Sequence, residues 1–303
     1  MDKILVTGGT GLVGRCFTGP RYERIGSKHG NLLDRDFLSR LISHSDYEGI
    51  IHCAARVGGI VGNMNNQGLY FYENIMMNST LIEEARIRGI KKLVFFSSTC
   101  VFPDKVEYPL TPEKIHLGPP HPSNYGYAYA KRMGIIQAKA YREQYGVNYI
   151  SVIPCNIYGP GDNYNITDGH VIPSLIHKIY KAKLEGSDFT VWGSGKPMRE
   201  FIYSQDVADL TSQIYDNYQG EDPVILSTSE EVSIKDLVYM IAKIFEFKGR
   251  IVFDDSKPDG QFRKPSDNSV IKSMFPDFKF TPLEQGLEMS IDWFLKNYNT
   301  ARK

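Results

Sequence analysis

In the first half of this chain, apolar runs of strand length alternate with longer segments that carry apolar residues at helical spacing. The strand-like runs are KILVT at 3–7, GIIHCAA at 49–55, KKLVFFSS at 91–98 and NYISVIP at 148–154. Between them, apolar residues recur every three or four positions at 34–43, 68–88 and 125–145. This alternation predicts parallel strands joined by crossover helices, so we expect an α/β fold with a Rossmann-type doubly wound parallel sheet.

After Gly159 the pattern changes to shorter, mixed elements. Apolar spacing predicts helices at 170–183, after Ser204, after the capping residue Ser233 and at 287–298, with strands at 189–192, 223–227 and 250–254. We therefore predict two domains: a Rossmann domain over 1–160 with a return segment near 195–220, and a smaller mixed α/β lid, discontinuous, over most of 161–303. The stretch 103–124, rich in proline, glycine and histidine, is expected to be a functional loop.

The charge balance and the cysteine spacing exclude several classes of protein. Lysine plus arginine and aspartate plus glutamate number 35 each, so no net charge favours a nucleic acid or a membrane surface as partner. No apolar run approaches the roughly 18 to 20 residues of a membrane span, and the first residues lack the apolar core of a signal peptide, so we expect a cytoplasmic protein. The four cysteines, at 16, 53, 100 and 155, show no CxxC spacing, which predicts neither a metal site nor a disulfide framework.

A glycine-rich turn, TGGTGLVG, directly follows the first strand-like run. Glycine lets the backbone approach a diphosphate, which then binds amide donors at the positive end of the next helix. Because the turn follows an N-terminal strand, a dinucleotide is favoured over the alternative of an ordinary glycine turn. The predicted cofactor-binding residues of this turn are Gly8, Gly9, Thr10, Gly11, Leu12, Val13 and Gly14.

The residues after the second strand bear on the choice of cofactor. NAD sites place an acid there for the ribose 2′-hydroxyl, whereas RYERIGSKHGNLLD places Ser27 and Lys28 there, with Arg15 just past the third glycine. A hydroxyl and cations suit a 2′-phosphate, so NADPH is predicted. A solvated surface lysine is the alternative, because residues 15–26 are few for a crossover helix and a strand.

A YxxxK pair, Tyr127 and Lys131, places a phenol and an ammonium group one helical turn apart. A lysine beside a tyrosine is expected to stabilise the phenolate and to allow proton transfer near neutral pH. Ser98, at the end of the fourth strand-like run, can share the same carbonyl oxygen of a substrate. Tyr125 and Tyr129 do not have the required spacing.

Together the glycine turn, the strand-end serine and the YxxxK pair resemble the extended short-chain dehydrogenase/reductase family. Further segments resemble the GDP-L-fucose synthases within it over nearly the whole chain: AARVGGIVGN, SSTCVFP, SNYGYAYAKRMG, PCNIYGPGDNYN, GHVIPSLIHK, WGSGKPMREFIY, and SDNS after DGQFRK. The resemblance implies NADPH-dependent 3,5-epimerisation and 4-reduction of GDP-4-keto-6-deoxy-D-mannose, and a homodimer formed through the helices at 68–88 and 125–145. The segment between Gly14 and Asn31 is shorter than the family pattern.

The resemblance also implies roles for single residues. Tyr127 and Lys131 would protonate the C4 oxygen, Ser98 would help to hold it, Cys100 would be the epimerising base, and His170 the opposing acid. Without the motif context, Cys100 would be read as a small buried residue and His170 as a surface residue. The remaining cofactor residues implied are Lys131, His170, Pro154, Cys155, Asn156 and Ile157, and the substrate residues are Asn156, Lys178, Trp192, Arg199 and Asp259.

Two rival functions stay open. Another extended-family sugar-nucleotide epimerase or reductase would use the same core residues, and a 4-epimerase would regenerate its nicotinamide. A catalytically silent NADP-binding module would have no reason to keep Ser98, Tyr127 and Lys131 together.

Overall fold

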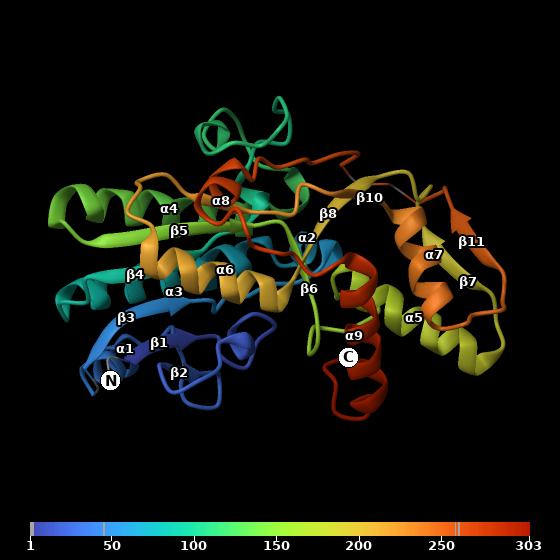
Figure 1. Cartoon of the computed structure of the whole chain (residues 1–303), viewed down its shortest axis with the longest axis horizontal. Coiled ribbons are helices and arrows are strands. Elements are labelled where there is room, and N and C mark those ends of the chain that lie inside the picture. Colours follow the sequence, from blue (N-terminus) through green and yellow to red (C-terminus); the bar gives the residue numbers. More distant parts are fainter. Residues whose placement is uncertain (1–2, 45, 258, 260) are drawn as a thin grey trace.

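The computed structural model describes residues 3–44, 46–257, 259 and 261–303, and its main feature is a six-stranded parallel sheet (Figure 1). The strands lie in the order β2-β1-β3-β4-β5-β9. The order reverses between β1 and β3, and in open α/β sheets ligands bind at the carboxyl ends of strands at such a point. The bounds are β1 Lys3–Thr7, β2 Tyr22–Ile25, β3 Tyr47–His52, β4 Lys92–Phe96, β5 Asn148–Pro154 and β9 Val224–Leu226.

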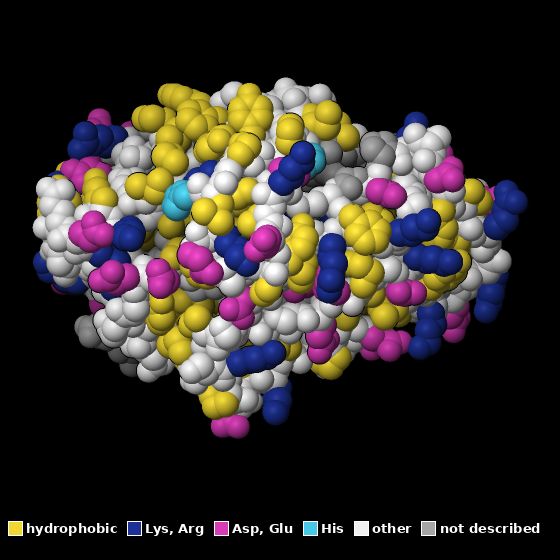
Figure 2. All heavy atoms as spheres, turned by 90° about the horizontal axis from the view of Figure 1, so that it is seen from above, with side chains coloured by type: hydrophobic (Ala, Val, Ile, Leu, Met, Phe, Trp, Pro, Cys, Tyr) yellow, Lys and Arg dark blue, Asp and Glu magenta, His cyan; other side chains and the backbone are white. Residues whose placement is uncertain are grey.

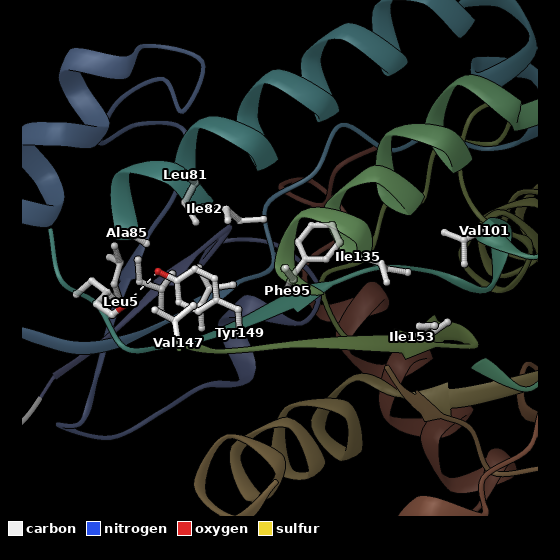
Figure 3. Packing of buried hydrophobic residues seen from close by; sticks show 14 of the residues in the cluster. Leu5, Leu81, Ile82, Ala85, Phe95, Val101, Ile135, Val147, Tyr149 and Ile153 are labelled. Atoms are coloured by element: carbon white, nitrogen blue, oxygen red, sulfur yellow. Dashed lines mark hydrogen bonds between the residues drawn. The ribbon is translucent and has the colours of Figure 1, made fainter. Parts of the chain in front are cut away.

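Alternating side chains bury both faces of this sheet, as parallel strands require. Leu5, Ile50 and Phe95 face a layer of helices made of α1 Arg35–Ser43, α3 Gln67–Ile87 and α4 Tyr125–Tyr145 (Figure 3). Ile4 and Ile51 face the opposite way, towards α6 Ser204–Asn217 and α8 Ser269–Met274. The predicted doubly wound α/β fold is therefore confirmed.

The first crossover differs from the prediction, because no α-helix follows the glycine turn. Only a three-residue 3₁₀ helix, η1 Gly14–Cys16, lies between β1 and β2. An α-helix rises only about 1.5 Å per residue, so the few residues before Tyr22 cannot form one that runs back along β1 and still turn at both ends. The chain therefore returns to β2 through turns and this one 3₁₀ helix.

A second group of elements has its own buried core. It contains a three-stranded sheet in the order β10-β8-β6 and a two-stranded sheet of β11 and β7 (Figure 1). The strand bounds are β6 Asn156–Tyr158, β7 Phe189–Trp192, β8 Met198–Tyr203, β10 Glu231–Ser233 and β11 Ile251–Asp254. The helices are α5 Val171–Glu185, α7 Ile234–Ile244 and α9 Leu283–Lys296. The domain boundaries stay a prediction, and α6, β9 and α8 are later segments that return to the large sheet.

The stretch 103–124 contains only short elements. The remaining helical pieces of the chain are α2 Ile60–Asn65 and the 3₁₀ helices η2 Thr99–Val101, η3 Pro112–Lys114 and η4 Pro122–Asn124. Hydrogen bonds join this stretch to a distant segment, since Leu110 N donates to Pro265 O at 2.8 Å and Asp267 N donates to Leu110 O at 2.9 Å.

None of the helices in the described ranges combines the length and apolar character needed to cross a membrane.

Candidate active site

The glycine turn lies at the carboxyl end of β1, beside the point where the strand order reverses. Gly8 has a φ of +70°, and a Cβ on Gly14 would lie 2.2 Å from Gly8 O, so both positions require glycine. The amides of Leu12 and Val13 donate to no acceptor within the part of the chain that the structure describes. The turn therefore offers unpaired amide donors and fits the diphosphate of a dinucleotide.

Lys28 and Arg15 lie in different surroundings. β2 ends at Ile25, and Lys28 is exposed in the turn that follows this strand, where the sequence analysis expects it. The Arg15 side chain instead donates to Thr10 O at 2.8 Å and to Gly11 O at 3.1 Å, and its guanidinium lies 5.8 Å from the Trp293 ring centroid. These contacts direct the Arg15 side chain to the glycine turn and to α9, and its expected place near a 2′-phosphate stays a prediction.

Ser98, Cys100, Tyr127 and Lys131 come together where β4 and the first turns of α4 meet. Ser98 caps η2, where its hydroxyl accepts a hydrogen bond from Cys100 N at 3.3 Å. Lys131 Nζ donates to Phe96 O at 2.8 Å and lies 6.0 Å from the Tyr127 ring centroid. Ser98 forms a hydrogen bond with the Tyr127 phenol, and Cys100 interacts with the phenol electrostatically.

The electrostatics of this cluster differ from the expectation for a YxxxK pair. Burial raises the pKa of Tyr127 and the nearby Cys100 raises it further, while a hydrogen bond with Ser98 lowers it. Burial also lowers the pKa of Lys131 to about 7. Lys131 does not lower the pKa of the phenol, because an ammonium group with a pKa of about 7 is already neutral at the pH where the phenol would ionise. Tyr127 is therefore neutral and can donate a proton.

Asn124 is a site residue that the sequence analysis missed. Its Nδ2 donates to Cys100 Sγ at 3.1 Å, and its Oδ1 is buried without a partner within the described ranges. The unpaired oxygen can accept a hydrogen bond from a ligand. The only signal in the sequence was its position three residues before Tyr127.

Lys264 is a second residue that the sequence analysis did not single out. Burial lowers its pKa, and its charge interacts with Cys100, Arg199 and Asp104. Its place follows from the hydrogen bonds that join residues 263–267 to the stretch 103–124, among them Tyr108 Oη to Arg263 O at 2.7 Å. A cation therefore lies beside the thiol, 164 positions further along the chain.

His170 is not in contact with this cluster. It is exposed at the N-terminal end of α5, and no hydrogen bond, ion pair or ring contact of the described residues joins it to Cys100 or Tyr127. It interacts instead with Asp162, a buried carboxyl whose pKa is raised by burial and lowered by His170 and by two arginines. The structure thus places His170 at the edge of the site.

The predicted substrate residues fall into two groups. Lys178 Nζ lies 5.0 Å from the Trp192 ring centroid, and burial lowers the pKa of Lys178. Asp259 accepts hydrogen bonds from the amide and the hydroxyl of Ser194, which follows β7, at 2.6 and 2.7 Å. Arg199 is half-buried near Lys264, on the side of Cys100.

The segment 154–157 links the two parts of the molecule. Pro154 is the last residue of β5, and Asn156 and Ile157 begin β6 in another sheet. The Cys155 side chain is buried in the core under the large sheet, so only its backbone is available to a cofactor. Asn156 is exposed, and its Nδ2 donates to Glu200 O at 2.8 Å.

Comparisons with known proteins agree with this geometry. Residues 4–226 match the NAD dependent epimerase/dehydratase family. A GDP-L-fucose synthase from Dictyostelium discoideum is 47% identical, over 99% of this chain and 97% of the relative. A probable GDP-L-fucose synthase from Drosophila melanogaster is 43% identical, over 100% of this chain and 100% of the relative. The two chains align over 321 positions, so the relative carries residues that have no counterpart among the 303 residues here.

A solved structure shows the same fold. It is a GDP-L-fucose synthetase from Naegleria fowleri bound to NADP, with 44% identity and a TM-score of 0.95, covering 100% of this chain and 95% of that one. The glycine turn, the YxxxK helix and these matches lead to one conclusion: the chain belongs to the NAD-dependent epimerase/dehydratase family, in the branch of the GDP-L-fucose synthases.

Proposed function

We propose that this protein is a bifunctional epimerase and reductase that converts GDP-4-keto-6-deoxy-D-mannose to GDP-L-fucose with NADPH. The observation that carries the proposal is the thiol of Cys100, which lies beside the Ser98 and Tyr127 hydroxyls and accepts a hydrogen bond from Asn124. A reductase needs only the hydroxyls, whereas a base beside them is what epimerisation next to the ketone requires.

In the epimerisation steps, Cys100 removes a proton from a carbon adjacent to the C4 ketone. The electron pair moves onto the C4 oxygen, and the resulting enolate is held by hydrogen bonds from Ser98 and Tyr127. His170 returns a proton on the opposite face, which inverts the carbon. The sequence of events is repeated, so that both C3 and C5 are inverted. Because His170 is exposed at the edge of the site, the bound substrate must bring His170 and Cys100 together.

In the reduction step, Tyr127 donates its proton to the C4 oxygen. Its neutral, half-buried phenol is in the form that this step needs. NADPH, when bound, supplies the hydride to C4. Lys131 titrates near neutral pH and is the proposed partner that supports Tyr127 during the transfer.

The ligands have separate binding residues in this proposal. Residues 8–14 bind the diphosphate of NADPH, Lys28 binds its 2′-phosphate, and residues 154–157 with His170 bind the nicotinamide end. For the sugar nucleotide, Lys178 and Arg199 bind the GDP phosphates, Trp192 supplies an apolar contact and Asp259 accepts a hydrogen bond from the nucleotide or the sugar. Asn156 is a further substrate residue. The support is that Lys178 and Trp192 already form a cation and ring contact at 5.0 Å.

The direct test incubates purified protein with GDP-4-keto-6-deoxy-D-mannose and NADPH and identifies the product sugar by NMR. GDP-L-fucose with one NADPH consumed per product supports the proposal. Turnover without net NADPH consumption would show a 4-epimerase instead. NADPH binding without any product would point to a silent binding module.

We also propose a homodimer formed through α3 and α4. These helices pack against each other, and their outer sides expose apolar residues, namely Leu69, Phe71, Tyr72, Met76, Met133 and Ile136. Figure 2 shows hydrophobic side chains gathered on the half of the molecule that holds the large sheet. A contiguous apolar face of this kind is typical of an interface. A cytoplasmic location stays a prediction from the sequence.

A further inference from the structure

The short first crossover deprives the glycine turn of the helix that normally follows it. In dinucleotide folds this helix places its positive end at the diphosphate, and its amides bond the carbonyls of the turn. Here η1 has three residues, Gly14–Cys16, which cannot supply a comparable dipole. The inference below rests on the proposed binding of NADPH.

Side chains bond the carbonyls that a longer helix would have bonded. Arg15 donates through Nε to Gly11 O at 3.1 Å and through Nη2 to Thr10 O at 2.8 Å. Cys16 Sγ lies 3.4 Å from Leu12 O as a weak donor. Further along, Arg24 Nη1 donates to Arg15 O at 2.7 Å. The Arg15 backbone amide also donates to Gly11 O, at 3.2 Å, so side-chain donors supplement the bonds of a first helical turn, with Arg15 as the central residue.

These bonds determine which way the amides of the turn point. Across a trans peptide the carbonyl and the next amide point in opposite directions. Because Gly11 O faces Arg15, the Leu12 amide faces away from it, and that amide has no acceptor within the described ranges. A charged donor on the carbonyl also polarises the peptide group, which strengthens its amide as a donor to an anion.

We propose that Arg15 is a cofactor-positioning residue, which orients the glycine turn and gives it the positive charge that a crossover helix would otherwise supply to the diphosphate of NADPH. It acts through the peptide groups of the turn and not by contact with the 2′-phosphate.

The surroundings of Arg15 hold it in this position. Its guanidinium lies over the Trp293 ring of α9. Gly161 has a φ of +78°, which favours glycine, and a Cβ there would come within 1.6 Å of Arg15 Nη1, so the guanidinium packs against this glycine. The buried carboxyl of Asp162 lies within electrostatic range of it. The arginine therefore lies between two segments that are far apart in the sequence, residues 161–162 and α9.

The test measures the Kd of NADPH by fluorescence titration at several salt concentrations for the full chain and three variants. Arg15→Met should weaken NADPH binding by about tenfold and lower the dependence of log Kd on log salt, since one cation is lost. Arg15→Gln keeps a donor without the charge and should show the same loss of salt dependence. Arg15→Lys keeps the charge and should retain most of that dependence.

The matched control is Arg21→Met. Arg21 forms ion pairs with Glu48 and Asp216 at 2.9 and 2.7 Å, so this variant should lower the melting temperature and leave the Kd of NADPH unchanged. Adenosine 2′-monophosphate, which lacks the diphosphate, should bind Arg15→Gln as well as it binds the unmodified protein.

Two outcomes are kept apart by this design. If the unmodified protein binds no NADPH, the proposed function is wrong. If it binds NADPH and Arg15→Gln or Arg15→Met binds it with a Kd within twofold and an unchanged salt dependence, Arg15 only fills space in the turn and the inference is overturned. Should Arg15→Met fail to fold, the comparison between Arg15→Gln and Arg15→Lys decides the matter.

Discussion

Cys100 is the residue at which the two proposed chemistries separate. It accepts a hydrogen bond from Asn124 at 3.1 Å and lies near the ammonium group of Lys264. This sulfur is the proposed base, and the thiolate is the reactive form of cysteine. Ser98 and Tyr127, by contrast, hold and protonate an oxygen. Base and acid are thus carried by different side chains within one cluster.

Cys100→Ser should abolish epimerisation and leave reduction in place. An alcohol has a pKa about six to seven units above that of a thiol, so the variant keeps the shape and loses the base. In deuterated water without NADPH, the unmodified protein should exchange the C3 and C5 protons of the keto-sugar, as followed by NMR, and Cys100→Ser should not. Undiminished exchange in the variant would show that another residue is the base.

Tyr127→Phe should lower reduction by about a hundred- to ten-thousandfold, because the general acid is lost. The ring remains, so the Kd of NADPH should change by less than about twofold. Single-turnover NADPH oxidation measures the effect. Tyr129→Phe is the matched control on the same helix, since Tyr129 packs against Arg132. An equal loss in that variant would contradict the assignment of Tyr127.

Lys28→Met should reduce the preference for NADPH over NADH. The lysine is exposed just after β2 and, within the described ranges, makes no hydrogen bond or ion pair, so it is free for a 2′-phosphate. A charge-assisted hydrogen bond contributes about 1.5 to 3 kcal/mol, so the ratio of kcat/KM values should fall by about ten- to a hundredfold. An unchanged ratio would leave Lys28 as a surface lysine.

Helices α3 and α4 contribute apolar side chains both to the core and to the outer surface. On one side Leu81, Ile82 and Ile135 pack onto the large sheet (Figure 3). On the other side apolar residues are exposed, and the 58% exposure of Tyr72 is unusual for an aromatic residue that no partner covers. Helix α3 therefore carries apolar side chains on two sides, one in the core and one at the surface.

Ile136→Lys on α4 should convert the proposed dimer to a monomer, because a charge placed in an apolar interface is desolvated without a partner. Ile136 is 43% exposed in the single chain. Light scattering after size-exclusion chromatography measures the mass. Leu184→Lys on α5 is the control, a 67% exposed leucine away from these helices, and should leave the mass unchanged. A monomeric unmodified protein would refute the dimer.

The molecule as a whole carries a buried cation at its centre. Burial lowers the pKa of Lys131 from its ordinary 10.5 to about 7. Between these two pH values the unfolded chain holds one proton more than the folded chain, so the free energy of unfolding rises with pH across this range. The cost of burying the charge is fully present below about pH 7 and is absent above about pH 10.5.

Lys131→Met should therefore stabilise the protein at pH 7 by about 1 to 3 kcal/mol while it removes activity. The gain should shrink towards pH 10, where the lysine is neutral and its hydrogen bond to Phe96 O is the only loss. Denaturant titrations at several pH values measure it. Lys139→Met, at an exposed lysine of the same helix, should show no such trend. A gain that does not vary with pH would contradict the titration of Lys131.

Local sequence signals were enough for most of the fold. The strands at 3–7 and 148–154 and the helix at 125–145 have the bounds that were predicted. Asp34 caps α1 and Ser233 caps α7 through side-chain bonds to backbone amides. Such signals act within a few residues, where periodicity and capping can be read directly. The glycine turn and the YxxxK spacing belong to the same class.

Contacts between distant segments were decided only by the tertiary structure. Lys264 comes near Cys100 because residues 263–267 are hydrogen-bonded to the stretch 103–124. Asn124 reaches Cys100 because α4, which directly follows Asn124, packs against η2. Arg15 turns to the glycine turn and Trp293, although its position suggested the 2′-phosphate. The pKa of Lys131 likewise depends on its burial. A sequence records the order and the type of residues, whereas desolvation and the meeting of remote side chains depend on how the whole chain packs.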